Sequence, residues 1–325
     1  MVSKSTNHHS PLLLSPRREN GRLLPSSPSS PPPPPPPMKP AARRRLLLLA
    51  ALAAAALLSF LLLAPPFTGR LSLASLLLLP FPVSPYAGKP KLLFLLAGQS
   101  NMAGRGVAPS PLPPPFRPHP RVLRLAASRR WVTAAPPLHA DIDTHKACGL
   151  GPAMPFARRL LDAASPDLVL GLVPSAVGGT RIWMWDRGQP LYDAAVARTR
   201  AAVDAGGGTL GAVLWFQGES DTIELADATA YGGRMQRLVN DFRADLGVPN
   251  LLVIQVGLAS GEGNYTDIVR EAQRNIKLPN VILVDAMGLP LRDDQLHLST
   301  EAQLRLGDML AQAYLKFNSS TDSRQ

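Results

Sequence analysis

The stretch KLLFLLAGQSNMAGRG, residues 91–106, decides the fold of this chain. Its first seven residues, Lys91–Ala97, form an apolar run that is typical of a buried parallel strand. Ser100 follows at the predicted end of that strand, between Gly98 and Gly104, where a tight turn would expose its hydroxyl group. Serine alone is a weak nucleophile, so the chain must also supply a base, a carboxylate that orients the base, and donors for an oxyanion.

Four more apolar strands are predicted further along the chain, and amphipathic helices separate them. The five predicted strands are Lys91–Ala97, Leu168–Pro174, Ala212–Phe216, Leu251–Val256 and Val281–Asp285. The predicted helices are Pro152–Ala164, Leu191–Ala205, Ala226–Leu246, Asp267–Ile276 and Thr300–Lys316. This alternation indicates an α/β domain with a five-stranded parallel sheet between layers of helices. Ligands bind such sheets at the carboxyl ends of the strands, so site residues should directly follow strands.

The charge of the chain is concentrated before this domain. Residues 1–90 contain ten Lys or Arg and one acid, Glu19, whereas the remaining 235 residues contain 24 basic and 22 acidic side chains. A nucleic-acid partner would require a basic folded surface, so we expect none. The single cysteine, Cys148, permits neither an intrachain disulfide nor a zinc cluster.

The first 64 residues combine a low-complexity tail with an apolar segment. Residues 1–45 are rich in Pro, Ser and basic side chains and are predicted to be disordered. Residues 46–64 follow three arginines and contain no charge, and as a helix they would span about 28 Å. We therefore predict a transmembrane signal anchor, with the later domain in the lumen of the ER or Golgi.

Two alternatives to the anchor remain open. A start at Met38 would leave a cleavable signal peptide and a secreted protein, and the Ser-rich basic N-terminus is also typical of an organellar transit peptide. After the predicted anchor, residues 65–90 are predicted to be a linker or stalk, 91–316 the folded domain and 317–325 a tail.

Four segments at predicted strand ends can converge on one site. They are the turn around Ser100, Val177–Thr180, Trp215–Ser220 and Asp293–Ser299. His297 can serve as the base for Ser100, and Asp294, three residues earlier, can accept the other ring N–H and fix the tautomer. Asp293 is the neighbouring competitor for that role, but the spacing favours Asp294.

Other side chains in these segments allow two interpretations each. Gln217 could satisfy buried backbone groups, or its amide could donate to an oxyanion. Glu219 could be a second acid or base, but bracing of the Ser100 turn is the simpler role because His297 already supplies a base. Trp183 and Trp185 could belong to the core or offer a surface on which sugars stack.

Three motifs carry a resemblance to a known family. With GQSNMAGRG at 98–106, QGESD at 217–221 and DQLH at 294–297, residues 90–316 resemble the SGNH hydrolase superfamily. The resemblance is closer to its carbohydrate esterase family 6 and sialate O-acetylesterase-like group. It implies a flavodoxin-like three-layer α/β/α fold and the hydrolysis of acetyl esters on sugars, without a metal or other cofactor. Alternatives are acetyl transfer between glycans and a non-catalytic glycan-binding module.

The resemblance also implies roles for individual residues. Ser100 matches the nucleophile, His297 the base and Asp294 the orienting acid. The oxyanion donors would be the Ser100 N–H, an N–H at Gly179 or the equally placed Gly178, and the Gln217 amide. The expected supporting residues are Gln99, Asn101 and Glu219. Gln217 stands where the broader superfamily usually has Asn, and Gln99 where it has Asp; both departures fit the narrower group.

Overall fold

The structure is a computed structural model that describes residues 84–205 and 208–322. The predicted tail and signal anchor, residues 1–45 and 46–64, lie outside these ranges, so the anchor and the lumenal location stay predictions. Within the described ranges, no helix has the length and apolar character needed to cross a membrane.

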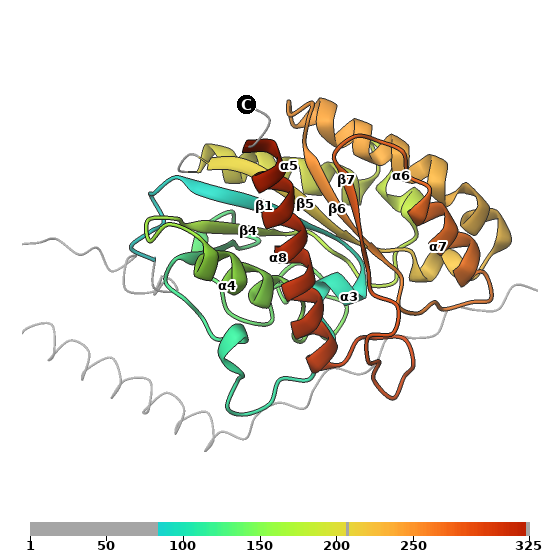
Figure 1. Cartoon of the computed structure of the whole chain (residues 1–325), viewed down its shortest axis with the longest axis horizontal. Helices are drawn as coiled ribbons and strands as arrows, with labels where there is room; N and C mark the ends of the chain where they lie inside the picture. Colours follow the sequence, from blue (N-terminus) through green and yellow to red (C-terminus); the bar gives the residue numbers. More distant parts are fainter. Residues whose placement is uncertain (1–83, 206–207, 323–325) are drawn as a thin grey trace, which may run out of the picture. The chain divides into compact units, whose positions relative to one another are not determined.

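Seven strands form a single sheet with β1 near its centre (Figure 1). The spatial order is β3-β2-β4-β1-β5-β6-β7, and each neighbouring pair is parallel except β2 with β3. The strands are β1 Lys91–Gly98, β2 Val122–Leu125, β3 Trp131–Thr133, β4 Leu170–Pro174, β5 Gly208–Phe216, β6 Leu252–Gly257 and β7 Val281–Asp285. The five predicted strands are therefore all present, in the relative order of a flavodoxin-like sheet.

The predicted count of five strands is wrong, because β2 and β3 extend the sheet beyond β4. These two strands are only four and three residues long, and β2 carries Arg124 among its apolar residues. So short a run does not show the apolar pattern of a buried strand. Arg124 is accommodated because it pairs with Asp141 and also donates to the Leu138 carbonyl.

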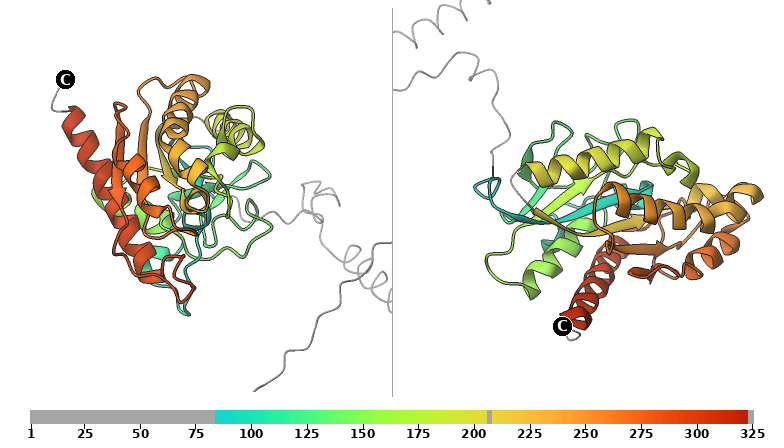
Figure 2. Two further views of the ribbon diagram at one scale, coloured as in Figure 1. Left: turned by 90° about the vertical axis from the view of Figure 1, so that its right-hand side faces the viewer. Right: turned by 90° about the horizontal axis from the view of Figure 1, so that it is seen from above.

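Helices cover the sheet and connect its parallel strands. They are α3 Ser100–Ala103, α4 Ala153–Ala163, α5 Pro190–Asp204, α6 Leu225–Asp245, α7 Thr266–Arg274 and α8 Thr300–Asp322, with 3-10 turns at Pro114–Phe116, Ile182–Trp185 and Glu219–Thr222. Helices α4 and α8 pack together on one face of the sheet and α5 lies on the other (Figure 2). Helix α8 runs past the predicted end at Lys316, and Phe317 packs against the core.

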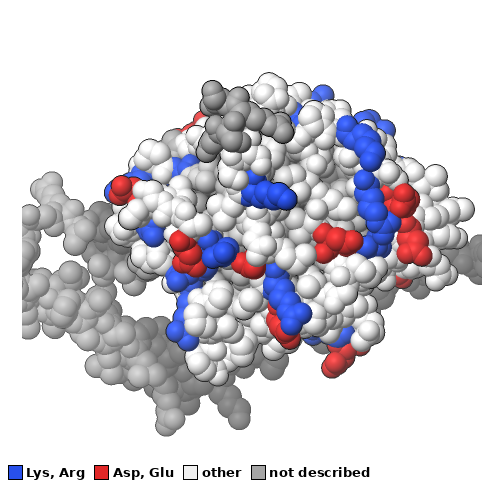
Figure 3. All heavy atoms as spheres, in the orientation of Figure 1, with Lys and Arg blue, Asp and Glu red and all other residues white. Residues whose placement is uncertain are grey.

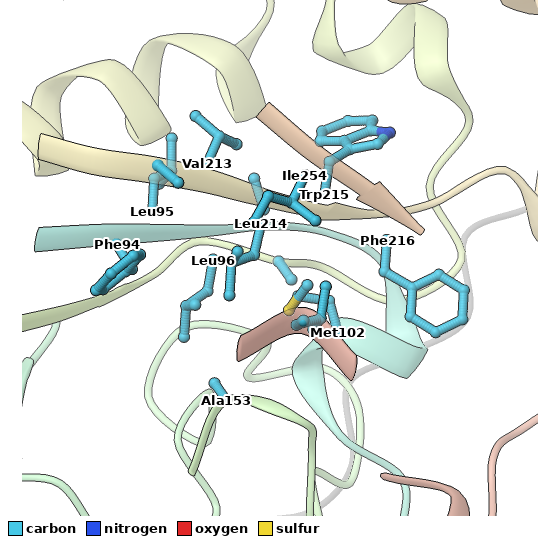
Figure 4. Packing of buried hydrophobic residues seen from close by; sticks show 14 of the residues in the cluster. Phe94, Leu95, Leu96, Met102, Ala153, Val213, Leu214, Trp215, Phe216 and Ile254 are labelled. Carbon is cyan, nitrogen blue, oxygen red and sulfur yellow. The ribbon is translucent and has the colours of Figure 1, made fainter. Parts of the chain in front are cut away.

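The core is continuous through β1 and β5, in which residues 93–98 and 212–216 are all buried. Figure 4 shows these side chains together with Met102, which projects from α3 into the same cluster. Met102 is 1% exposed, and burial of a side chain of this size contributes about 1.5–3 kcal/mol. The short α3 helix is thus anchored to the core directly behind Ser100.

Gly98 is required where β1 turns into α3. Its φ angle is +126°, and a Cβ atom at this position would lie 2.1 Å from the carbonyl oxygen of Phe216. The Gln99 N–H donates to the same oxygen at 2.8 Å. The chain can therefore turn here only if residue 98 has no side chain.

We expect Gly98→Ala to destabilise the domain by about 3–5 kcal/mol, because it adds a backbone clash to an unfavourable φ angle. Gly188→Ala is a matched control, since Gly188 has φ +86° but open space around its Cβ position. The control should lose only about 1–2 kcal/mol. Urea unfolding of the three proteins measures the difference, and equal losses would contradict this account.

Candidate active site

Ser100 and His297 meet at the carboxyl edge of the sheet although 197 residues separate them in sequence. Ser100 begins α3 directly after β1, and His297 lies in the loop between β7 and α8. The distance from His297 Nε2 to Ser100 Oγ is 3.0 Å. His297 Nδ1 lies 2.9 Å from Asp294 Oδ2 on the opposite side of the ring. A proton on Nδ1 would be held by Asp294, which leaves the Nε2 lone pair to accept the Ser100 hydroxyl proton.

Asp294 is held in its ionised form by the loop that carries it. Its Oδ1 accepts the backbone N–H groups of Leu296 at 3.0 Å and His297 at 2.9 Å. Burial alone would raise the pKa of Asp294, but the backbone and ring hydrogen bonds of His297 outweigh burial and lower this pKa to about 2. Both Asp293 and Asp294 are exposed, but among the described residues only Asp294 makes hydrogen bonds to the His297 loop.

The Asn101 side chain connects the Ser100 turn to two other segments. Its amide nitrogen donates to Glu219 Oε1 at 2.7 Å and to the Leu296 carbonyl at 3.4 Å. Its oxygen accepts the backbone N–H of Leu298 at 2.9 Å. The residues on either side of His297 are thus hydrogen-bonded to the residue after Ser100, which fixes the distance between the Ser100 and His297 side chains.

Glu219 is completely buried behind this turn, and its Oε2 has no hydrogen-bond partner among the described residues. Burial raises the pKa of Glu219 to about 7, although the hydrogen bond from Asn101 opposes the shift. The carboxyl group thus accepts a hydrogen bond from the residue next to Ser100, and its bracing role stays a prediction.

The glycine loop after β4 approaches Ser100 closely. A Cβ atom on Gly178 would lie 3.4 Å from Ser100 Cβ. The Gly178 N–H donates to Asp143 Oδ2 at 3.1 Å, and the same oxygen accepts Arg105 Nη2 at 2.6 Å. Within the described part of the chain, the N–H groups of Gly179 and Ser100 have no hydrogen-bond partner. Of the two equally placed glycines, Gly179 is therefore the one whose N–H is available.

The Gln217 amide is already engaged by protein groups. Its nitrogen donates to the Thr180 carbonyl at 2.8 Å and to Asp221 Oδ2 at 2.5 Å, and lies 3.3 Å from Gln99 Oε1. Asp221 also accepts the Ile182 N–H, and burial raises the pKa of Asp221 to about 6. Gln217 thus links β5 to the glycine loop, and donation to an oxyanion would require it to release one of these bonds.

The two tryptophans after the glycine loop have different surroundings. Trp185 is fully buried, and its ring packs edge-on against Trp215 with centroids 5.2 Å apart. Trp183 is 39% exposed. Trp185 therefore belongs to the core, and only Trp183 offers an open aromatic surface.

Basic and acidic side chains are interspersed on the face drawn in Figure 3, with no single large basic patch on that face. Across 84–205 and 208–322, no three His, Cys, Asp or Glu side chains are grouped as they would be around a metal ion. The expectations of no nucleic-acid partner and no cofactor stay predictions.

Sequence reasoning missed Asp143 and Arg105, although both contact the elements around Ser100. Arg105 stands in the GRG sequence that follows the Ser100 turn, but nothing in that sequence indicates an ion pair. Asp143 and Asp141 occupy the same polar loop, so composition could not show which of them is buried at the site. Only the side-chain contacts distinguish them.

Comparison with protein families places the chain in a known group. The family model for carbohydrate esterase, sialic acid-specific acetylesterase, matches residues 90–316. A protein of Arabidopsis thaliana named probable carbohydrate esterase At4g34215 is 51% identical over 238 residues, which cover 70% of this chain and 91% of that protein. The chain therefore belongs to this carbohydrate esterase family.

Solved structures give the same fold. The X-ray structure of protein AT4G34215 from Arabidopsis thaliana has a TM-score of 0.67 at 50% identity, and covers 70% of this chain and 98% of its own. The crystal structure of NanS has a TM-score of 0.59 at 20% identity, and covers 72% of this chain and 99% of its own. The NanS resemblance shows the fold alone.

The raised pKa of Glu219 predicts a dependence of stability on pH. A carboxyl group whose pKa is higher in the folded than in the unfolded protein stabilises the folded state while the group is protonated. This stabilisation is complete below the unfolded pKa near 4.5, and it is lost as the pH rises through the folded pKa of about 7. Glu219→Gln removes this loss. Between pH 4.5 and pH 8, the free energy of unfolding of the variant should therefore rise by on the order of 3 kcal/mol relative to that of the wild type. Urea unfolding across this range measures the gain.

Glu271→Gln is the control for this experiment. The Glu271 carboxylate is exposed, and hydrogen bonds from Asn275 and Arg274 lower its pKa. This variant should therefore show no gain as the pH rises. If both variants follow the wild type in parallel, the buried Glu219 does not titrate as described.

Proposed function

We propose that this carbohydrate esterase hydrolyses O-acetyl esters on sugars, with Ser100 as nucleophile, His297 as base and Asp294 as the acid that orients the base. The observation that carries the proposal is the continuous hydrogen-bonded path from Ser100 Oγ through the His297 ring to Asp294, with distances of 3.0 and 2.9 Å. This is the order of groups that activates a serine hydroxyl.

In the first half of the proposed reaction, Ser100 Oγ attacks the acetyl carbonyl carbon while its proton passes to His297 Nε2. The carbonyl oxygen becomes an oxyanion as the Oγ–carbon bond forms. The tetrahedral intermediate then breaks the bond to the sugar oxygen, which takes the proton from His297. The sugar leaves with a free hydroxyl group, and the acetyl group stays on Ser100.

In the second half, water attacks the acetyl–Ser100 carbonyl and gives a proton to His297. The new intermediate releases acetate, and the proton returns to Ser100 Oγ. Asp294 stays ionised throughout and stabilises the imidazolium that forms twice. Its hydrogen bonds from the loop backbone suit that role, because they favour the charged carboxylate.

The proposed oxyanion donors are the Ser100 N–H, the Gly179 N–H and the Gln217 amide. The two backbone groups are free of other partners within the described residues, so they can donate without rearrangement. Gln217 would contribute by exchanging its bond to Thr180 or Asp221 for one to the oxyanion. Donors already in place stabilise the transition state at no reorganisation cost.

The acetyl acceptor distinguishes hydrolysis from transfer. The names of the family and of the Arabidopsis relative support a sugar ester as substrate. With an acetylated sugar as donor and a free sugar as added acceptor, hydrolysis releases one acetate for each ester lost. An acetylated acceptor in place of acetate would indicate the transferase alternative.

We expect Ser100→Ala to lower the hydrolysis of p-nitrophenyl acetate by the full-length chain by at least about 10³-fold, with residual turnover from the oxyanion donors. Ser175→Ala is the matched control, because Ser175 also follows a strand and is 5% exposed but its hydroxyl has no partner among the described residues. This control should keep wild-type rates. Equal rates for all three proteins would refute the assignment of Ser100.

A second pair of variants tests the orienting acid. Asp294→Asn should lower kcat by about 10³- to 10⁴-fold, because the amide cannot hold the required tautomer of His297. Asp293→Asn changes the same charge one residue away, where no contact with the His297 ring is present, and should leave kcat almost unchanged. The opposite ranking of the two variants would transfer the role to Asp293.

A further inference from the structure

We propose that Asp143 is a positioning residue that holds the Gly178–Gly179 loop in the conformation in which the Gly179 N–H can meet the oxyanion. This inference rests on the proposed function and extends it to a residue outside the four strand-end segments. Among the described residues, no hydrogen bond joins Asp143 to Ser100 or His297, so we infer that it acts through the backbone that it fixes.

The contacts of Asp143 support this role. Its side chain is 1% exposed, and Oδ2 accepts both the Gly178 N–H at 3.1 Å and Arg105 Nη2 at 2.6 Å. Its own backbone N–H donates to the His139 carbonyl at 2.8 Å, which fixes the residue in its loop. One carboxylate oxygen thereby joins the loop after β4 to the residue that follows the nucleophile helix.

Other hydrogen bonds hold the loop on both sides of Gly179, and Asp143 adds one at Gly178. The Val177 N–H donates to the Gly98 carbonyl at 3.0 Å. The Thr180 hydroxyl donates to the Val177 carbonyl at 2.9 Å and accepts Trp185 Nε1 at 3.2 Å. Without Asp143, the Gly178 peptide would be free to rotate between these two fixed points, since glycine has a wide range of backbone conformations.

The Arg105 guanidinium offsets the negative charge of the buried Asp143 carboxylate, which would otherwise oppose the formation of an oxyanion nearby. An unpaired negative charge there would repel the transition state, whereas the Arg105 guanidinium lies against it with only 9% of its side chain exposed. A Cβ atom at residue 178 would lie 2.4 Å from Arg105 Nη2, so a side chain there would displace the guanidinium from its place beside Asp143. Gly178, Arg105 and Asp143 therefore form one unit beside Ser100.

The test compares Asp143→Ala with Asp141→Ala in the full-length chain. Asp141 also pairs with an arginine, Arg124, and accepts a backbone N–H, that of Ala127, but none of these contacts involves the glycine loop. Asp143→Ala should lower kcat for p-nitrophenyl acetate by about 10- to 100-fold with little change in KM, less than the loss of a whole oxyanion donor. Asp141→Ala should keep the wild-type kcat.

Two further measurements separate positioning from general destabilisation. Amide hydrogen exchange in the peptide covering residues 176–182 should be about tenfold faster in Asp143→Ala than in the wild type or Asp141→Ala. Asp143→Asn keeps an oxygen acceptor for Gly178 and should restore kcat to within about threefold of the wild type. Should Asp143→Ala fail to fold, the double variant Asp143→Ala/Arg105→Met removes both buried charges and still leaves Gly178 without its acceptor.

The outcomes are distinct. Unchanged exchange in the 176–182 peptide, or faster exchange with an unchanged kcat, would overturn the positioning role. Equal losses of kcat in the Asp141 and Asp143 variants would also overturn it. If the wild type hydrolyses no acetyl ester, the proposed function fails, while the exchange comparison still decides whether Asp143 holds the loop.

Discussion

The Asn101 side chain is the interaction on which the geometry of the site depends. It donates to Glu219 after β5, and it both donates to and accepts from the backbone around His297. A single amide thereby connects three strand-end segments. Hydrogen bonds between buried groups in fixed positions are directional, so this arrangement sets the orientation of the His297 loop as well as its distance from Ser100.

Four carboxyl groups lie in or beside the site, and their surroundings differ. Asp294 is partly exposed and accepts three hydrogen bonds from its own loop. Asp143 is paired with a guanidinium. Glu219 and Asp221 have no ion pair among the described residues, and their pKa values are raised by burial. The lowered pKa of Asp294 favours the carboxylate that the proposed chemistry uses. The raised pKa values of Glu219 and Asp221 favour the neutral form of these two carboxyl groups.

Much of this arrangement could be predicted from the sequence, because it depends on short-range patterns. The apolar run before Ser100 predicts a buried strand, and the Asp-x-x-His spacing before α8 predicts an acid beside a base. Because parallel strands bring their carboxyl ends to one edge of the sheet, both segments are expected at the same site. The strands β2 and β3 were missed because they are too short to show a pattern. Asp143 was missed because its role arises from a contact with Gly178, 35 residues away, which no local spacing encodes. The engagement of Gln217 by Asp221 is likewise a property of packing.

The separation of Ser100 and His297 along the chain has a consequence for how the protein acquires activity. The proposed nucleophile, Ser100, follows the first strand of the domain, and His297 lies just before the last helix. Contacts between such distant residues form late, because a long loop must close before they are made. A chain emerging from the ribosome would carry the serine long before it carried the histidine. Esterase activity would thus report the docking of the final loop and α8, and a truncated domain would have a serine with no base.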